Sequence, residues 1–176
     1  RLRGRKPLTL REDFGGTGLL AHEWVRQGPQ HKAWAIDLDA PTLEYGRKVH
    51  TPKLTAAQKK RLALLEGNVL DSYSFRPDIT VAFNFSYFIF KRRQDLLAYF
   101  RSVRKGLGAD GMFAIDLFGG TEAFKPLVET KKFRSHSYFW DCERYNPLTH
   151  EVFYYIHFKH KDVKYKRAFT YDWRMW

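Results

Sequence analysis

Cysteine is almost absent from this sequence. The 176 residues include a single cysteine, Cys142, so no disulfide can form within the chain, and we expect a reducing, intracellular compartment. No apolar run approaches the roughly 20 residues that a membrane-spanning helix needs, and no secretory signal is present. We therefore expect a soluble protein without a membrane partner. Position 1 is Arg rather than Met, so we expect the native start to lie upstream.

Acidic residues are also scarce. The chain has 19 Asp and Glu against 31 Lys and Arg, a net charge of +12. Basic residues cluster at three places: Arg1, Arg3, Arg5, Lys6 and Arg11; Arg47, Lys48, Lys53, Lys59, Lys60 and Arg61; and Lys91, Arg92 and Arg93. Such an excess favours polyanions, so RNA or a ribonucleoprotein is a candidate partner, and a merely solvated basic surface is the alternative. The histidines show no metal-ligand spacing, and we expect no metal.

Apolar runs alternate with amphipathic segments over the first two thirds of the chain. The runs near residues 8–10, 32–37, 62–65, 79–83 and 112–115 are typical of strands. Helices are predicted by the apolar face of residues 93–105, by Pro41 at a helix start, and by a capping box from Thr55 to Gln58. Near-continuous apolar strands alternating with helices indicate an α/β doubly wound fold, with a mainly parallel sheet covered on both faces.

The pattern changes beyond residue 130. Residues 163–173 alternate between aromatic or apolar and polar side chains, as a strand with one buried face does. Residues 153–160 behave similarly, with turns expected at 146–149 and 160–162. We expect an antiparallel β add-on of about three strands after strand five. The predicted organisation is a core over residues 1–130 and an extension over residues 131–176 that packs on the same domain.

The stretch from Arg11 to Ala21 combines glycines with acids. Its glycines predict a tight turn between a strand and a helix, where backbone N–H groups can face a polar or anionic ligand. Asp37 follows Gly18 by nineteen positions and ends the second apolar run, where a carboxylate can accept both hydroxyls of a ribose. The pattern predicts a nucleotide-cofactor site. A nicotinamide dehydrogenase is one alternative, but a pyrophosphate would be poorly served by the acids before the glycines.

These features resemble the motifs of class I S-adenosylmethionine (SAM) dependent methyltransferases. Residues 12–18 resemble that family's acidic-x-Gly-x-Gly-x-Gly loop, residues 35–39 its ribose motif, residues 67–71 its adenine segment, and residues 106–113 its turn before strand five. The resemblance covers residues 8–118 and implies a strand order of 3-2-1-4-5, with SAM as the cofactor. It implies a cofactor site made of Glu12, Asp13, Gly15, Gly16, Gly18, Asp37, Leu38, Asn68, Val69 and Asn84.

Residues 84–87 follow the fourth apolar run. Asn84 and Tyr87 match the Asn and the Tyr of the Asn-Pro-Pro-Tyr motif with which amine-directed methyltransferases grip an amino nitrogen, so they are the candidate catalytic residues. The alternatives are that Asn84 caps the strand and Tyr87 packs in the core. Asp116 either opens toward the same edge of the sheet or caps a turn. Glu12 and Asp13 either answer the ammonium group of the methionine moiety or pair with a local arginine such as Arg11.

The sequence thus predicts a SAM-dependent methyltransferase whose acceptor, not yet identified, is an amine-bearing small molecule or RNA. One feature of the loop supports a different function: Phe14 stands where the family has its first glycine. The alternative is a catalytically inactive methyltransferase-like protein that acts in RNA binding or ribonucleoprotein assembly through its positive charge.

Overall fold

A computed structural model describes residues 4–176, so Arg1 and Arg3 of the first basic cluster lie outside the described residues. The described chain divides into two units. The first contains the residues up to Ser86 and the segment Leu96–Asp116; the second contains Tyr87–Asp95 and Leu117–Trp176. Each unit has a sheet of its own.

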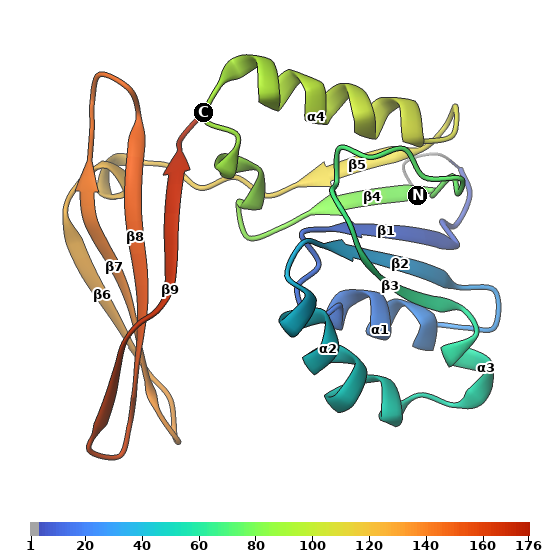
Figure 1. The fold of residues 1–176 in the computed structure, drawn as a ribbon, viewed down its shortest axis with the longest axis horizontal. Coiled ribbons are helices and arrows are strands. Elements are labelled where there is room, and N and C mark those ends of the chain that lie inside the picture. Colours follow the sequence, from blue (N-terminus) through green and yellow to red (C-terminus); the bar gives the residue numbers. More distant parts are fainter. Residues whose placement is uncertain (1–3) are drawn as a thin grey trace. The chain divides into compact units, whose positions relative to one another are not determined.

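The first unit is built on a five-stranded sheet in the order β3-β2-β1-β4-β5, in which every neighbouring pair is parallel (Figure 1). The strands are β1 (Thr9–Asp13), β2 (Lys32–Asp37), β3 (Leu62–Glu66), β4 (Ile79–Ala82) and β5 (Met112–Ile115). This confirms the predicted strand order. Because all strands run the same way, the residues that end them meet at one edge of the sheet.

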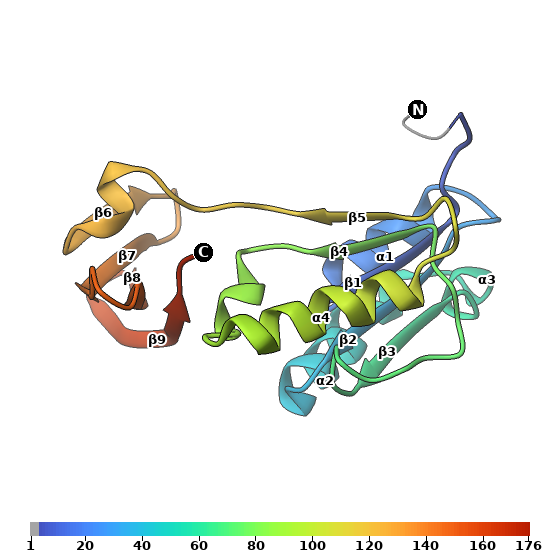
Figure 2. The same cartoon turned by 90° about the horizontal axis from the view of Figure 1, so that it is seen from above.

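Helices lie on both faces of this sheet. They are α1 (Leu19–Arg26), α2 (Ala40–Val49), α3 (Ala56–Lys59) and α4 (Arg93–Gly106), with a short 3-10 turn, η1, at Thr51–Lys53. Figures 1 and 2 together show α1 and α4 on opposite faces. The predicted capping box is confirmed, because the side chains of Thr55 and Gln58 each accept the other residue's backbone N–H. The side chain of Asp39 caps α2 by accepting the N–H of Thr42.

The two faces differ in what they bury. On the α1 face, Ala21 and Val25 pack against Leu10, Ala33 and Ala35 of the sheet in a purely apolar cluster. On the α4 face, the ring of Tyr99 is fully buried and meets the ring of Phe113 with 5.9 Å between centroids. The α4 face also contains two buried charged residues, Arg11 and Asp13.

The second unit contains an antiparallel sheet in the order β6-β7-β8-β9. Its strands are β6 (Leu127–Lys132), β7 (Ser137–Tyr145), β8 (Glu151–His160) and β9 (Val163–Arg174), with short 3-10 turns η2 (Ser86–Ile89) and η3 (Thr121–Phe124). The antiparallel add-on after strand five is confirmed, with one strand more than the sequence predicted. Strand β6 was missed because all of its residues are exposed, so it lacks the alternation that marks a half-buried strand.

Among residues 4–176, no helix is both long enough and apolar enough to cross a membrane.

Candidate functional site

The glycine loop joins β1 to α1 through backbone conformations that favour glycine. Gly16 has φ 55° and Gly18 has φ 67°, both in the left-handed region, and Gly18 stands at the N-cap of α1. Phe14 has φ 54° as well, which an aromatic residue rarely adopts. The chain thus turns sharply at the carboxyl end of β1, and the N–H groups of Gly15 and Gly16 donate to the Ile36 carbonyl and the Asp37 carboxylate at the end of β2.

Two of the glycines also lie where an added Cβ would force a neighbouring residue to move. A Cβ on Gly15 would lie 2.9 Å from the Cβ of Ala35, and a Cβ on Gly18 would lie 2.5 Å from Cδ2 of Leu64. The N–H of Gly15 donates to the carbonyl of Ile36 at 2.9 Å, which fixes the loop against the end of β2. The loop is therefore held close to the edge of the sheet where β1 and β2 end.

Asp37 lies at the end of β2, directly beside this loop. Its Oδ2 accepts the N–H of Gly16 at 2.7 Å, and its Oδ1 accepts the N–H of Asp39 at 2.9 Å. These bonds orient the carboxylate, and each oxygen keeps a further lone pair for a ligand. The next residue, Leu38, has 67% of its surface exposed, so its side chain remains accessible.

Glu12 points to the α1 face. Its Oε2 accepts the N–H of Ala21 in α1 at 3.0 Å, and it forms no ion pair with the residues that the structure describes. Burial raises the pKa of the Glu12 carboxyl to about 7; the nearby charge of Asp37 adds to this, while the bond from Ala21 opposes it. A cation bound beside the glycine loop would lower this pKa and stabilise the ionised carboxylate.

Asp13 points to the α4 face and has partners within the protein. Its Oδ1 accepts from Nε of Arg11 at 2.6 Å, and its Oδ2 accepts from the hydroxyl of Tyr99 at 2.9 Å. Burial raises the pKa of the Asp13 carboxyl, and Arg11 and Tyr99 act against that rise. For Asp13 the structure therefore contains the salt bridge to Arg11 that the sequence left open as an alternative.

Asn68 and Val69 follow β3 in a tight turn. Oδ1 of Asn68 accepts the N–H of Leu70 at 3.0 Å, and the Asn68 carbonyl accepts the hydroxyl of Tyr73 at 3.0 Å. The side chain of Val69 is buried, and its carbonyl accepts from Nη2 of Arg11 at 2.7 Å. The loop that the sequence assigned to adenine is thus anchored to the sheet by Arg11.

Asn84 and Phe85 form a left-handed turn after β4, with φ 57° and 58°. Both N–H groups donate to the carboxylate of Asp116, at 2.7 and 2.9 Å. Asp116 therefore caps this turn, which was one of the two roles that the sequence allowed. The side chain of Asn84 is exposed. Tyr87 belongs to the second unit, where it is 2% exposed and its ring meets that of Phe88.

Within the first unit, the structure therefore brings Glu12, the three glycines of the loop and Asp37 together at one edge of the sheet. Asp13 points to the opposite face from Glu12, and Tyr87 lies in the other unit. In the described part of the chain, no group of three or more His, Cys, Asp or Glu side chains is placed to hold a metal ion.

The sequence analysis missed two residues that shape the loop. A Cβ on Gly46 of α2 would lie 2.1 Å from the carbonyl oxygen of Thr17, so only glycine lets this helix approach the loop. His22 of α1 is fully buried, and its ring nitrogens lie 2.6 Å from the Gly18 carbonyl and 3.0 Å from Oγ1 of Thr51. Burial lowers the pKa of His22, which favours its neutral form. The signal for Gly46 was a glycine inside a predicted helix, where it costs about 1 kcal/mol.

Known structures share this fold. A SAM-dependent methyltransferase from Clostridium acetobutylicum ATCC 824 matches with a TM-score of 0.70 and 18% identity over 96% of this chain and 67% of its own. The sugar N-methyltransferase KedS8 from Streptoalloteichus sp. ATCC 53650 matches with a TM-score of 0.69 and 16% identity, over 100% of this chain and 69% of its own. SAM-bound CalS10, an amino pentose methyltransferase from Micromonospora echinaspora, matches with a TM-score of 0.74 and 12% identity, over 100% of this chain and 72% of its own.

These likenesses confirm that the chain has the fold of SAM-dependent methyltransferases, as the sequence resemblance implied. The chain spans about two thirds of the length of these structures. No protein-family model matches the sequence, and no curated protein matches it.

Proposed function

We propose that this protein binds SAM at the glycine loop and transfers its methyl group to an amine-bearing acceptor. The observation that carries the proposal is the arrangement at the ends of β1 and β2. The glycine loop, in which a Cβ on Gly15 or Gly18 would lie within 3 Å of a neighbouring atom, lies between two carboxyls: Glu12, which is half-buried and has no ion pair with the described residues, and Asp37, which is oriented by two backbone N–H groups. These residues belong to a fold that known SAM-dependent methyltransferases share.

The residues present suit the chemical groups of SAM. Glu12, whose pKa burial raises to about 7, would pair with the ammonium of the methionine moiety. The glycine backbone would line the same moiety. Asp37 would accept the ribose hydroxyls, and the turn at Asn68 and Val69, together with Leu38, would contact the adenine. Asp13 keeps its internal partners and would contribute by holding Arg11.

SAM supplies a methyl group on a sulfonium, and the sulfur leaves as a neutral thioether when the methyl group is transferred, which makes it an excellent leaving group. The protein therefore needs chiefly to position the acceptor and to exclude water. Asn84 is the residue of the first unit suited to this task, because it is exposed at the carboxyl end of β4 and its backbone is fixed by Asp116. Its side-chain carbonyl would accept a hydrogen bond from an amine and orient the nitrogen. Tyr87 remains a candidate partner for the same amine.

Two observations bear on the acceptor. KedS8 is a sugar N-methyltransferase and CalS10 an amino pentose methyltransferase, and both names support an amine on a small molecule. The net charge of +12 favours RNA, either as a methyl acceptor or as the ligand of an inactive methyltransferase-like protein that acts in ribonucleoprotein assembly. For an RNA ligand, the logarithm of the affinity should fall steeply with the logarithm of the salt concentration. Turnover of a small amine should be nearly insensitive to salt.

The deciding experiment is calorimetric titration with SAM and with its demethylated product. We expect Asp37→Ala to weaken binding by about 1–3 kcal/mol, because a charged hydrogen-bond acceptor is lost. Glu44→Ala, which removes an exposed carboxylate from α2, is the control and should leave the affinity unchanged. Unchanged affinity in the Asp37 variant would remove the ribose assignment, and no binding by the folded wild-type protein would leave the RNA-binding alternative.

Asn84→Ala tests the acceptor side. We expect turnover of an amine acceptor to fall by more than the affinity for SAM, because Asn84 would act on the acceptor and not on the cofactor. Steady-state kinetics at saturating SAM, combined with calorimetry on the same variant, separates the two effects. Equal losses would mean that Asn84 shapes the cofactor pocket instead.

A further inference from the structure

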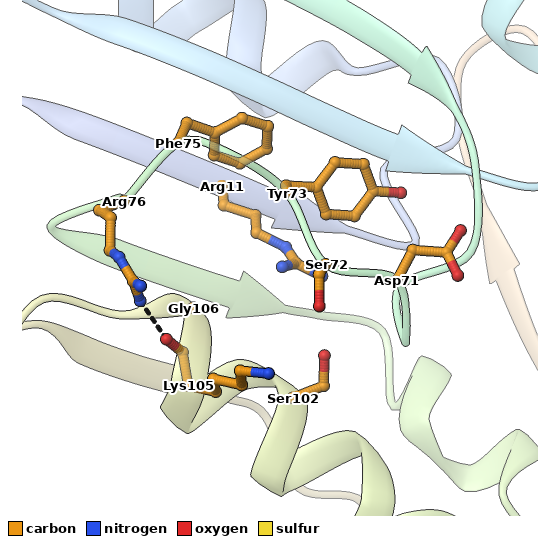
Figure 3. Close-up of a pocket in the computed structure, with 9 residues that line it drawn as sticks. All are labelled: Arg11, Asp71, Ser72, Tyr73, Phe75, Arg76, Ser102, Lys105 and Gly106. Atoms are coloured by element: carbon orange, nitrogen blue, oxygen red, sulfur yellow. Dashed lines mark hydrogen bonds between the residues drawn. The ribbon is translucent and has the colours of Figure 1, made fainter.

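A cavity lies within the first unit, on the α4 face of the sheet. It has a volume of about 150 Å³ and opens between the connection that follows β3 and the last turn of α4 (Figure 3). The residues that line it are Arg11, Asp71, Ser72, Tyr73, Phe75, Arg76, Ser102, Lys105 and Gly106. Glu12 and the core around α1 lie on the other face, so this cavity is distinct from the proposed SAM site.

Arg11 forms the inner wall of the cavity and is only 3% exposed. Two of its three guanidinium nitrogens have partners, since Nε binds Asp13 and Nη2 binds the Val69 carbonyl. The third, Nη1, makes no hydrogen bond to any residue in the described range 4–176. It lies 3.6 Å from the position that a Cβ on Gly106 would take. This N–H group therefore remains available to an acceptor in the cavity that Arg11 lines.

The other groups around the cavity are mostly donors. Figure 3 shows Arg11 extending from the sheet toward α4, and Arg76 lying against the backbone of Lys105. The cations of Arg76 and Lys105 and the hydroxyl of Ser72 complete the set, whereas the Ser102 hydroxyl donates to the Leu70 carbonyl at 3.2 Å. The one acid is Asp71, whose Oδ2 lies 3.3 Å from the backbone nitrogen of Asn68. Since Asp13 balances Arg11, the remaining charges leave the cavity positive.

We propose that this cavity binds a phosphate group, either as free phosphate or as part of a small phosphomonoester. A phosphate presents several oxygens in different directions, and guanidinium, ammonium and hydroxyl donors approach this cavity from the sheet, from the connection after β3 and from α4. Nη1 of Arg11 would donate to one oxygen from inside, while Arg76 and Lys105 would bind the others from the rim. The site goes beyond the methyltransferase function and does not depend on it.

Titration calorimetry with inorganic phosphate, and separately with a phosphomonoester such as glycerol phosphate, tests the site. Arg76→Gln combined with Lys105→Gln should weaken binding at least about tenfold, because two charged donors to the phosphate oxygens are lost. Arg101→Gln combined with Arg104→Gln is the matched control. It removes the same charge from exposed positions of α4 that do not line the cavity, and it should change the affinity less than twofold.

Arg11 itself is tested without substitution, because its replacement would disturb the fold. We expect the side-chain NMR signals of Arg11, followed in ¹⁵N-arginine-labelled protein, to shift on addition of phosphate with the affinity found by calorimetry. Tighter binding of the phosphomonoester would identify a phosphomonoester as the ligand. Equal affinity would mean that the cavity recognises only the phosphate group. Absence of binding, equal loss in both double variants, or an unmoved Arg11 signal would each overturn the proposal. If both double variants weakened the binding of an RNA oligonucleotide equally, these cations would belong to a general basic surface instead.

Discussion

The two faces of β1 treat neighbouring carboxylates in opposite ways. On the α4 face, Asp13 is buried but bonded to Arg11 and Tyr99. On the α1 face, Glu12 has a single backbone donor and no cation among the described residues, and its pKa is raised to about 7. The first arrangement holds the fold together. The second leaves a carboxyl without a counter-charge, and under the proposed function the ammonium group of SAM would supply that charge.

The largest effect should come from removing the ion pair between Arg11 and Asp13 on the α4 face. Arg11→Met removes the partner of a buried carboxylate, and we expect the free energy of unfolding to fall by about 3–5 kcal/mol. Urea denaturation monitored by circular dichroism measures the loss. Arg11→Met combined with Asp13→Asn should recover most of it, because no unpaired charge remains and the new amide oxygen can still accept from Tyr99. A double variant as unstable as the single one would show that Arg11 acts through packing rather than charge.

A smaller loss is expected on the loop side from Gly46→Ala. The added methyl would lie 2.1 Å from the Thr17 carbonyl oxygen, so α2 must move away from the loop, at a cost of about 1–3 kcal/mol. The affinity for SAM should fall with it. Gly108→Ala is the control, since its Cβ would meet Oδ1 of Asp110 at an ordinary 3.9 Å. Equal stability of the two variants would mean that α2 adjusts without disturbing the loop.

The effect of Glu12→Gln should be the smallest at low pH and should grow as pH rises. The pKa of Glu12 is about 7 in the folded state against 4.5 for the free side chain, so the folded state binds more protons between these values. The stability that this proton provides is complete below pH 4.5 and lost as pH rises through 7. Relative to wild type, Glu12→Gln should therefore gain about 2–3 kcal/mol between pH 5 and pH 8. Urea denaturation at both pH values checks this, and a pH-independent difference would contradict the raised pKa.

Local signals made most of the first unit predictable. The five apolar runs became β1 to β5, and the capping box at Thr55 became the start of α3. These signals depend on residues near in sequence. The order of the strands came from the resemblance, because no local pattern says which strands pair.

The site was predictable only in part. The glycines and Asp37 could be identified because their chemistry and spacing lie within one strand-turn-helix unit and the next strand. The face on which each acid lies was not assigned, and the Asp13 partner Tyr99 is 86 residues away. Gly46 was missed because its contact with Thr17 depends on how α2 packs. Strand β6 was missed because its residues carry no buried face.

Arg11 donates both to Asp13 in the sheet and to the carbonyl of Val69 in the loop assigned to adenine, and its remaining nitrogen borders the phosphate cavity. A single rigid guanidinium thus touches two proposed binding sites on the chain. Thermodynamic linkage requires that any change which phosphate makes in the affinity for SAM be matched by an equal change which SAM makes in the affinity for phosphate. Through Arg11, the affinity of the protein for its methyl donor would therefore depend on the concentration of phosphorylated molecules around it.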